Sequence, residues 1–231
     1  MPIFVQHFFC QRPSKPKIFK SLQAPTILIT LSKFIDLNHL AHCFLSFGDE
    51  DLLLGNFIGD FVKGHDWEKY PRPVQRGILL HRSIDSYTDN HPLTDRSVTR
   101  IRSYARRYAP PFVDILYDHL LAINWDTHSS ETFEAFAEKT YKQLENRASE
   151  MPLILQERLP KMIAGRFLHG YTERAGLDWV LDRFSTRLSG QFDIPALSDA
   201  FFDQIDVFSE DFNGFFPELV AHARQTLLQN S

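Results

Sequence analysis

Apolar residues recur at intervals of three and four positions from residue 38 to the end of the chain. This spacing marks one face of an α-helix, whereas a half-buried β-strand alternates at every second position. Proline and glycine residues mostly separate the periodic segments. The pattern predicts an all-α fold, with helices near residues 38–47, 51–63, 73–88, 94–108, 111–125, 131–147, 153–169, 177–188, 195–213 and 217–228.

Two further features support this assignment. Residues suited to cap a helix or to occupy its first turn stand near several predicted starts, namely Asp49, Ser130, Ser198, Pro73, Pro111 and Pro195. No internal repeat, low-complexity tract or long linker divides the sequence. We therefore expect one helical domain over residues 37–231, with its many phenylalanines at helical spacing in the core.

The first 35 residues differ from the rest in composition. They contain five basic residues and no acidic residue, and the composition changes abruptly near Asp36. A basic stretch before the apolar residues 24–31 is also found in signal peptides, but no small-residue cleavage site follows and Lys33 interrupts the run. We expect residues 1–36 to be a poorly ordered extension, or upstream translation from a wrongly chosen start.

The chain is weakly acidic, with 25 Lys and Arg residues against 29 Asp and Glu residues. A net charge of −4 gives no global positive field, which argues against nucleic acid and anionic membranes as partners. Cys10 and Cys43 form no CxxC or metal-binding spacing, so a reducing, cytoplasmic location fits best. The sequence also lacks a P-loop, a dinucleotide fingerprint, a GxSxG serine elbow and an apolar run long enough to span a bilayer.

Acidic and imidazole side chains interrupt two of the apolar segments. Asn56 and Asp60 stand four residues apart, hence on one face of a helix that is otherwise apolar enough to be buried. His81, Asp85 and Asp89 form an i, i+4, i+8 stripe on the next helix. A buried carboxylate is costly unless it is paired or binds a metal. The two stripes therefore indicate a polar site inside an apolar domain.

A third helix adds Asp114 and Asp118 one turn apart, with His119 next to Asp118. Three successive helices that carry oxygen and imidazole ligands favour one shared site for Mn²⁺, Mg²⁺ or Fe²⁺ over a thiolate zinc site. A cation in such a site activates water and neutralises phosphoryl oxygens, which are the requirements for hydrolysis of a phosphoester.

Each of these residues, taken singly, also has a structural explanation. A lone histidine such as His42 or His119 is more often a satisfied core or boundary residue. Asp85 can pair on the surface with Arg82, three residues back. Asp114 can be an exposed residue near the start of its helix, where it favours the helix dipole.

Four segments of the chain resemble the acyl carrier protein phosphodiesterase family. They are residues 37–42 (LNHLAH), 55–64 (GNFIGDFVKG), 81–85 with 88–89 (HRSID and TD), and 118–120 (DHL). The resemblance covers essentially residues 37–231. Proteins of this family typically begin with a sequence similar to residues 37–42, which supports the interpretation of residues 1–36 as an extension.

The resemblance implies a helical, HD-like, metal-dependent phosphohydrolase that removes the 4′-phosphopantetheine arm from holo acyl carrier protein, with Mn²⁺ as the usual metal. Carried onto this chain, it places Asp60, His81, Asp85 and the Asp118–His119 doublet in the site. We expect the metal to be held by Asp60, His81, Asp85 and Asp118. Further site residues are expected to be His119 as general acid, Arg82 as stabiliser of phosphoryl charge, and His42, Asn56 and Asp89.

Two departures from the family pattern affect this assignment. His39 replaces the usual apolar residue before Leu-Ala-His. The doublet has the order Asp-His, whereas typical HD hydrolases have His-Asp, so the ligand assignment of that superfamily does not transfer directly. Two other functions stay open: an HD-like hydrolase of another small phosphodiester or nucleotide, and a non-catalytic helical module that binds an acidic protein.

Five arginines fall within twelve residues of this acidic chain, and they are candidates for docking the acidic carrier protein: Arg96, Arg100, Arg102, Arg106 and Arg107. Exposed charges of this kind mainly accelerate encounter and fix orientation. A solvated charged helix face is the alternative explanation.

Overall fold

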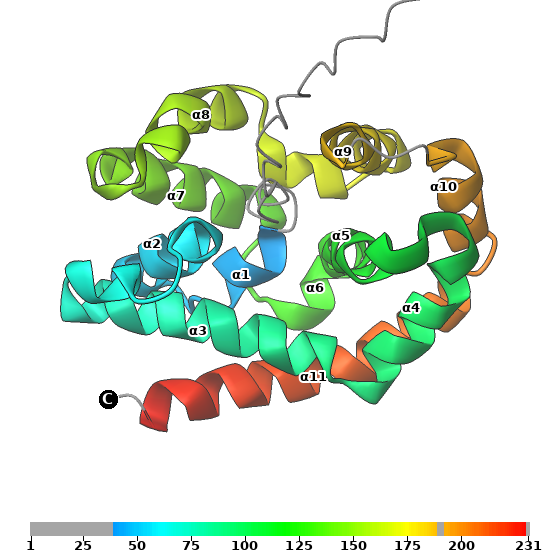
Figure 1. The fold of residues 1–231 in the computed structure, drawn as a ribbon, viewed down its shortest axis with the longest axis horizontal. Helices are drawn as coiled ribbons and strands as arrows, with labels where there is room; N and C mark the ends of the chain where they lie inside the picture. Colours follow the sequence, from blue (N-terminus) through cyan, green and yellow to red (C-terminus); the bar gives the residue numbers. More distant parts are fainter. Residues whose placement is uncertain (1–38, 189–191, 230–231) are drawn as a thin grey trace, which may run out of the picture. The chain divides into compact units, whose positions relative to one another are not determined.

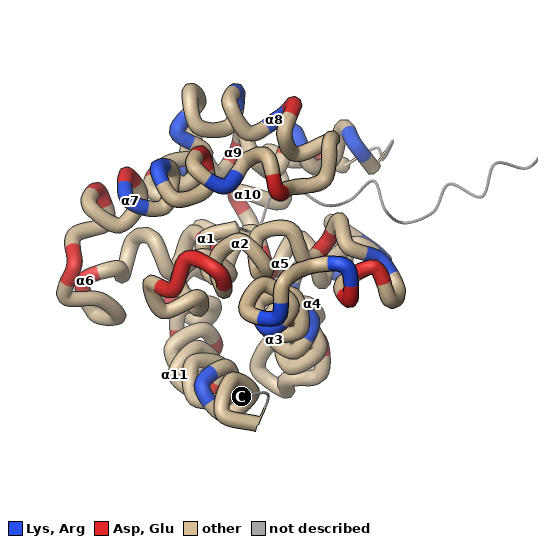
Figure 2. The backbone as a smooth tube through the Cα atoms, turned by 90° about the vertical axis from the view of Figure 1, so that its left-hand side faces the viewer, with Lys and Arg blue, Asp and Glu red and all other residues tan. Residues whose placement is uncertain are grey.

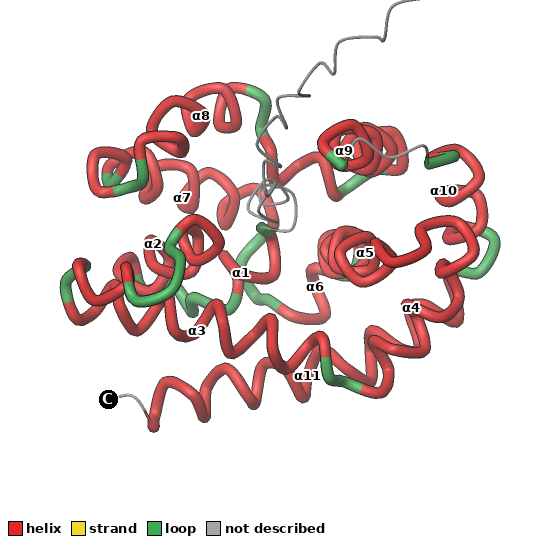
Figure 3. Tube along the Cα trace, in the orientation of Figure 1, coloured by secondary structure: helices red, strands yellow, loops and turns green. Residues whose placement is uncertain are grey.

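Helices form all the regular structure in residues 39–188 and 192–229, which are the residues that the computed structural model describes (Figure 3). The all-α fold class predicted from the periodicity is confirmed. The expected extension at residues 1–36 lies outside the described residues. The α-helices are α1 (Leu40–Phe44), α2 (Glu50–Ile58), α3 (Arg72–Asp89), α4 (Pro92–Ala105), α5 (Ala109–Ile123), α6 (Trp125–His128), α7 (Phe133–Asn146), α8 (Leu153–Ala164), α9 (Arg174–Arg187), α10 (Ile194–Phe202) and α11 (Ile205–Gln229).

Short 3₁₀ helices extend or connect several of these elements. They are η2 (Gly59–Phe61), η3 (Asp66–Lys69), η4 (Arg106–Tyr108), η5 (Ala148–Glu150) and η6 (Phe167–Tyr171). The carboxylate of Asp49 caps α2, as its position in the sequence predicts. The caps of α7 and α10 are Thr132 and Asp193 instead of the predicted Ser130 and Ser198.

The last two predicted helices were divided at the wrong place. The chain turns between α10 and α11 after Phe202, and Pro217 lies inside α11 instead of beginning a helix. A proline in a helix interior forfeits one backbone hydrogen bond, which normally ends the helix. Here the buried stripe of α11 continues past the proline to Leu219 and Ala223, and this packing holds the helix together.

Two glycines bring α2 and α3 into close contact. A Cβ atom on Gly55 would lie 2.2 Å from the backbone oxygen of Val74, and one on Gly77 would lie 2.5 Å from that of Leu52. Only glycine allows backbones to approach this closely. The crossing places the polar stripe at the end of α2 beside the polar stripe of α3.

Around this pair the remaining helices complete the core. Figure 1 shows α1 near the centre of the described helices, with α11 running alongside α3, which it contacts. α5 packs against α4, α9 and α1, and it forms much of the larger apolar cluster. Figure 2 shows basic and acidic residues interspersed along helices such as α7, α8 and α9. Among the described helices, none combines the length and the apolar character needed to cross a membrane.

Candidate functional site

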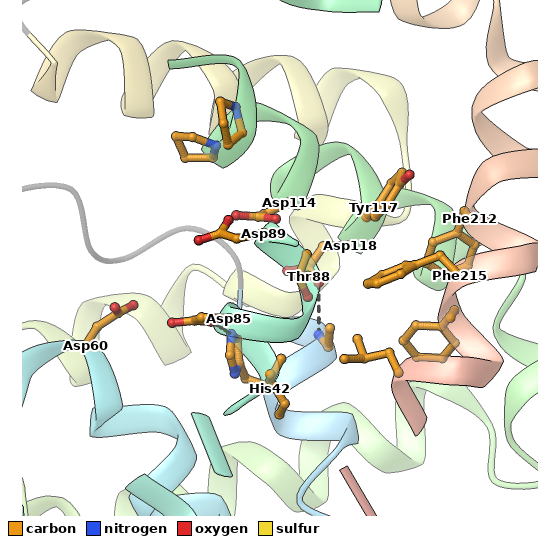
Figure 4. A pocket seen from close by; sticks show the side chains of 16 residues that line it. His42, Asp60, Asp85, Thr88, Asp89, Asp114, Tyr117, Asp118, Phe212 and Phe215 are labelled. Atoms are coloured by element: carbon orange, nitrogen blue, oxygen red, sulfur yellow. Dashed lines mark hydrogen bonds and ion pairs between the residues drawn. The ribbon is translucent and has the colours of Figure 1, made fainter. Parts of the chain in front are cut away.

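A cavity of about 310 Å³ opens between α1, α3, α5 and α11 (Figure 4). Among the described residues that line it, none is a lysine or arginine. Its lining includes His42 and five carboxylates: Asp60, Asp85, Asp89, Asp114 and Asp118. The structure thus brings together acidic residues of three predicted helices, as expected from the sequence, and within the described residues only imidazole side chains stand against their carboxylates.

His42 projects from the short helix α1 and is held in one orientation by Asn56 of α2. The Nδ2 group of Asn56 donates a hydrogen bond of 2.7 Å to the backbone oxygen of His42. The Oδ1 atom of Asn56 lies 2.8 Å from Nδ1 of His42 and therefore accepts from an Nδ1–H group. In a neutral His42 the lone pair is then on Nε2, which lies 3.2 Å from Oδ1 of Asp85.

His81 of α3 lies against His42, with ring centroids 4.2 Å apart. Its Nε2 atom is 3.3 Å from Oδ1 of Asp60 and 3.1 Å from Oδ2 of Asp85. Within the described residues, neither ring nitrogen of His81 has a well-formed hydrogen bond, although the ring is buried. The Nε2 atoms of both imidazoles therefore face carboxylate oxygens.

Gly59 provides the space for the His81 ring. A Cβ atom at position 59 would lie 2.3 Å from Cγ of His81 and 2.5 Å from its Cδ2. Contacts under 3 Å between carbon atoms are strongly repulsive, so any larger residue displaces the ring. The Gly59–Asp60 pair at the start of η2 thus both accommodates the imidazole and supplies a carboxylate to it.

A positive charge is needed between these groups. Burial by itself lowers the pKa of His81, but the carboxylates of Asp60 and Asp85 outweigh burial and raise this pKa to about 10. Burial raises the pKa of Asp85, yet its contacts with His42 and His81 hold that pKa well below its usual range. An imidazole lone pair facing a carboxylate is repulsive unless a proton or a metal ion lies between them.

The side chains around Asp85 are of the types that bind a divalent cation, which would supply the positive charge between them. One ligand atom from each of His42, His81 and Asp85 lies within 4.8 Å of the other two. Adjacent ligands on an octahedron with bonds of about 2.1 Å are about 3 Å apart, which is close to the separations of 3.1 to 3.3 Å between imidazole nitrogen and carboxylate oxygen. Imidazole and carboxylate donors suit Mn²⁺ or Fe²⁺. His42, His81, Asp85 and Asp60 are the residues that can hold such an ion.

Asp118, predicted as a metal ligand, makes a different set of contacts. Its two carboxylate oxygens accept hydrogen bonds of 3.0 and 2.9 Å from the backbone N–H groups of Leu40 and Ala41, at the start of α1. Burial raises the pKa of Asp118 to about 7, even though these two bonds favour the charged form. Asp118 thereby links α5 to the N-terminus of α1 and positions His42.

Two further carboxylates lie side by side in the cavity, Asp89 from α3 and Asp114 from α5 (Figure 4). Burial and the charge of Asp85 raise the pKa of both, and the pKa of Asp114 is raised well above its usual value. The sequence did not lead us to expect Asp114 in the site, because an acidic residue near the start of a helix also favours the helix dipole. Its i, i+4 spacing with Asp118 is the sequence feature that indicates a shared helix face.

The structure does not bring His119 to the cavity. Its Nδ1 atom lies 2.7 Å from the backbone oxygen of Tyr171, and its ring packs against Phe201 and Phe202. Arg82 is also committed elsewhere, because its guanidinium donates to the backbone oxygens of Val62 and Gly64. It thereby fastens the loop that follows Asp60.

The five predicted docking arginines separate into two groups. Arg96 and Arg100 of α4 contact the carboxylate of Asp211, which is fully buried on α11. Arg102 lies 4.0 Å from Asp95, and the Arg107 guanidinium bonds to the Tyr108 hydroxyl. Arg96 is exposed as well, as are Arg102, Arg106 and Arg107, whereas Arg100 is partly buried.

The comparisons with known proteins agree with the early resemblance. The family model described as acyl carrier protein phosphodiesterase matches residues 37–219. Proteins named acyl carrier protein phosphodiesterase from Salmonella paratyphi A, Salmonella dublin and Salmonella newport are each 29% identical over 196 residues, which is 83% of this chain and all of theirs. No solved structure matches the chain.

Proposed function

The chain belongs to the acyl carrier protein phosphodiesterase family, and we propose that it hydrolyses holo acyl carrier protein to the apo form in a reaction that depends on a divalent cation such as Mn²⁺. The oxygen of water bonds to phosphorus, the bond between phosphorus and the serine oxygen breaks, and the serine oxygen takes up a proton, which gives the apo carrier protein and free 4′-phosphopantetheine. A cytoplasmic location fits the sequence, because its two cysteines form neither a CxxC pair nor a metal-binding spacing.

One observation supports the metal requirement most strongly. The Nε2 atoms of His42 and His81 both face the carboxylate of Asp85, at 3.2 and 3.1 Å. Because Asn56 accepts from Nδ1 of His42, that ring offers its lone pair toward Asp85. A bound cation satisfies this arrangement and supplies Lewis acidity, activation of water and neutralisation of phosphoryl charge.

The protein's own residues then have distinct tasks. His42, His81, Asp60 and Asp85 hold the cation, and Asn56 fixes the tautomer and orientation of His42. Asp118 holds the start of α1 and so fixes the position of His42 relative to α5. This proposal does not use His119 or the Arg82 guanidinium, because each bonds to backbone oxygens outside the cavity.

The carrier protein approaches the mouth of the cavity. Pro110 and Pro111 are among the residues that line the cavity, and the exposed Arg106 and Arg107 of η4 come just before them in the chain. These two arginines are therefore the members of the predicted docking group best placed to meet an acidic partner. Changing both to Glu should raise the KM for holo carrier protein and leave the hydrolysis of a small phosphodiester unchanged.

Release of 4′-phosphopantetheine from holo carrier protein, followed by mass spectrometry, tests the proposed reaction. We expect turnover with Mn²⁺, loss of turnover after chelation, and recovery when Mn²⁺ is restored. Hydrolysis of bis(p-nitrophenyl) phosphate without release of the arm would indicate another phosphodiester substrate. A lack of hydrolysis of either compound would indicate a binding module.

A further inference from the structure

A pocket of about 480 Å³ lies beside α1, and it shares no described lining residue with the acidic cavity. The turn between α1 and α2, the loop between α6 and α7, and the helices α7 and α11 form its walls. Lys139 and Arg224 line it, and Glu131 is the one acidic residue among its described lining residues. We call it the basic pocket, because its charge is opposite to that of the cavity.

Both cations of the basic pocket lie against the same turn. The guanidinium carbon of Arg224 is 4.4 Å from the ring centroid of Phe47. A Cβ atom on Gly48 would be 3.6 Å from Nζ of Lys139. Phe47 and Gly48 have φ values of 51° and 78°, a left-handed conformation that is rare for an aromatic residue and persists only where the surroundings hold it. This turn thus brings together cations from distant parts of the chain.

Neither cation contacts a carboxylate within the described residues. By contrast, Arg147 at the end of α7 contacts both Asp51 and Glu150. A guanidinium that lies over an aromatic ring keeps the N–H groups of its edge available for other partners. The donors of Lys139 and Arg224 are therefore free to bind an anion, although the chain as a whole is acidic.

Neutral donors complete the lining of the basic pocket. The Oγ atom of Ser129 accepts a hydrogen bond of 3.1 Å from the backbone N–H of Glu131, which leaves its own hydroxyl proton to donate. Ser130 is exposed next to it. The Nε2 atom of His128, which also lines the pocket, is buried without a hydrogen-bond partner in the described part of the chain. The pocket therefore offers cationic and hydroxyl donors to a ligand rich in acceptor oxygens.

We propose that the basic pocket binds a small phosphate-bearing anion. A phosphate monoester carries about −1.5 to −2 charges at pH 7 and three acceptor oxygens, which matches two cations and several hydroxyl donors. A carboxylate offers a single charge and only two oxygens. The volume of the pocket is within the range of roughly 300–1,000 Å³ that is typical of sites for small molecules. This site is separate from the proposed reaction and does not depend on it.

Isothermal titration calorimetry on the full chain tests this site, with glycerol 3-phosphate as the probe. The titration is made with Mn²⁺ and again with EDTA, because a probe held only by a metal ion in the acidic cavity would not bind in EDTA. We expect binding under both conditions. Inorganic phosphate is titrated for comparison: equal affinity identifies the free ion as a sufficient ligand, and weaker binding identifies a phosphorylated molecule.

Three variants test which side chains hold the probe. Lys139→Ala and Arg224→Ala should each weaken binding by at least about tenfold, because each removes a charge-assisted contact. Both side chains are exposed, so helicity measured by circular dichroism should not change. Lys142→Ala is the matched control, because it removes an exposed lysine of the same helix that does not line the pocket.

Three results would overturn the proposal. The first is a lack of probe binding in EDTA. The second is wild-type affinity in both Lys139→Ala and Arg224→Ala. The third is an equal loss of affinity in Lys142→Ala, which would show that the probe responds only to the overall charge of the surface. Binding of glycerol as tight as that of glycerol 3-phosphate would likewise exclude recognition of the phosphate group.

Discussion

Two regions of this molecule contain buried carboxylates, and the side chains that surround the negative charge differ between them. On α11, Asp211 is fully buried, and it meets Arg96, Arg100 and the hydroxyl of Ser97. In the cavity, five carboxylates converge with His42, and none of the described residues that line it is a lysine or arginine. A buried carboxylate that contacts two arginines supports the fold, whereas several carboxylates gathered in a cavity with imidazoles mark a candidate binding site.

The difference explains why two arginines of α4 were predicted from the sequence to bind a partner, although they contact Asp211. Arg96 and Arg100 are close in sequence to three other arginines, so the sequence alone suggests that all five form one exposed docking surface. Their partner Asp211 is more than one hundred residues away and lies in an apolar, phenylalanine-rich segment. The contrast between the two regions therefore depends on the fold, which brings Asp211 of α11 to the arginines of α4.

The largest effect is expected from loss of a cavity ligand. His81→Ala and Asp60→Ala should each reduce turnover by at least about 1,000-fold, since activation of water and stabilisation of phosphoryl charge both depend on the bound ion. Helicity should stay near that of the wild type. Turnover and circular dichroism measured on the same samples check this prediction. Normal activity in both variants would contradict the assignment of these residues to a cation site.

Replacement of Asp211 is expected to lower the stability of the protein without lowering its activity. Asp211→Ala removes the buried carboxylate that Arg96, Arg100 and Ser97 contact, and it should lower the free energy of unfolding by about 1.5–3 kcal/mol. Urea denaturation measures this change. Because Asp211 does not line the cavity, activity per folded molecule should change by less than about twofold.

The paired replacement Asp211→Leu with Arg100→Leu serves as the control. It removes both partners of a buried contact and should recover part of the lost stability. A stable but inactive Asp211→Ala protein would mean that the two regions are not separate.

A smaller effect is expected at Gly59, which touches the ring of His81 without being a ligand. Gly59→Ala should weaken Mn²⁺ binding by about 10- to 100-fold, the range typical of residues that support a ligand. Gly165→Ala is a comparison outside the cavity, where a new Cβ atom lies 3.2 Å from its nearest neighbour. Unchanged Mn²⁺ affinity in Gly59→Ala would show that the ring position does not matter.

Per pH unit, the smallest effect is the dependence of cation affinity on pH. The pKa of His81 is raised to about 10, so its proton stabilises the metal-free fold fully below about pH 6.5, and this stabilisation is lost as the pH rises through 10. A cation must displace that proton, so its affinity should rise by up to about tenfold per pH unit between pH 7 and 9. Calorimetry in buffers of different ionisation enthalpy should detect release of about one proton. Binding that is independent of pH would contradict this.

The sequence predicts a good part of both the fold and the site. Helical periodicity identified most helices, and the i, i+4 spacing identified Asp60, His81 and Asp85, because both depend on local geometry. The roles of Asp118 and His119 were not predictable, because they depend on which neighbours α1 and η6 bring to them. The paired state of Asp211 depends equally on distant packing.

The central claim is that the carboxylates and imidazoles gathered around Asp85 bind a divalent cation. Electron paramagnetic resonance of free Mn²⁺ during a protein titration measures this binding directly. The account predicts that the wild type and Asp211→Asn bind Mn²⁺ alike, and that Asp85→Ala, which removes the carboxylate shared by His42 and His81, binds at least about 100-fold more weakly. Absence of binding to the wild type, or equal binding to Asp85→Ala, would contradict the account.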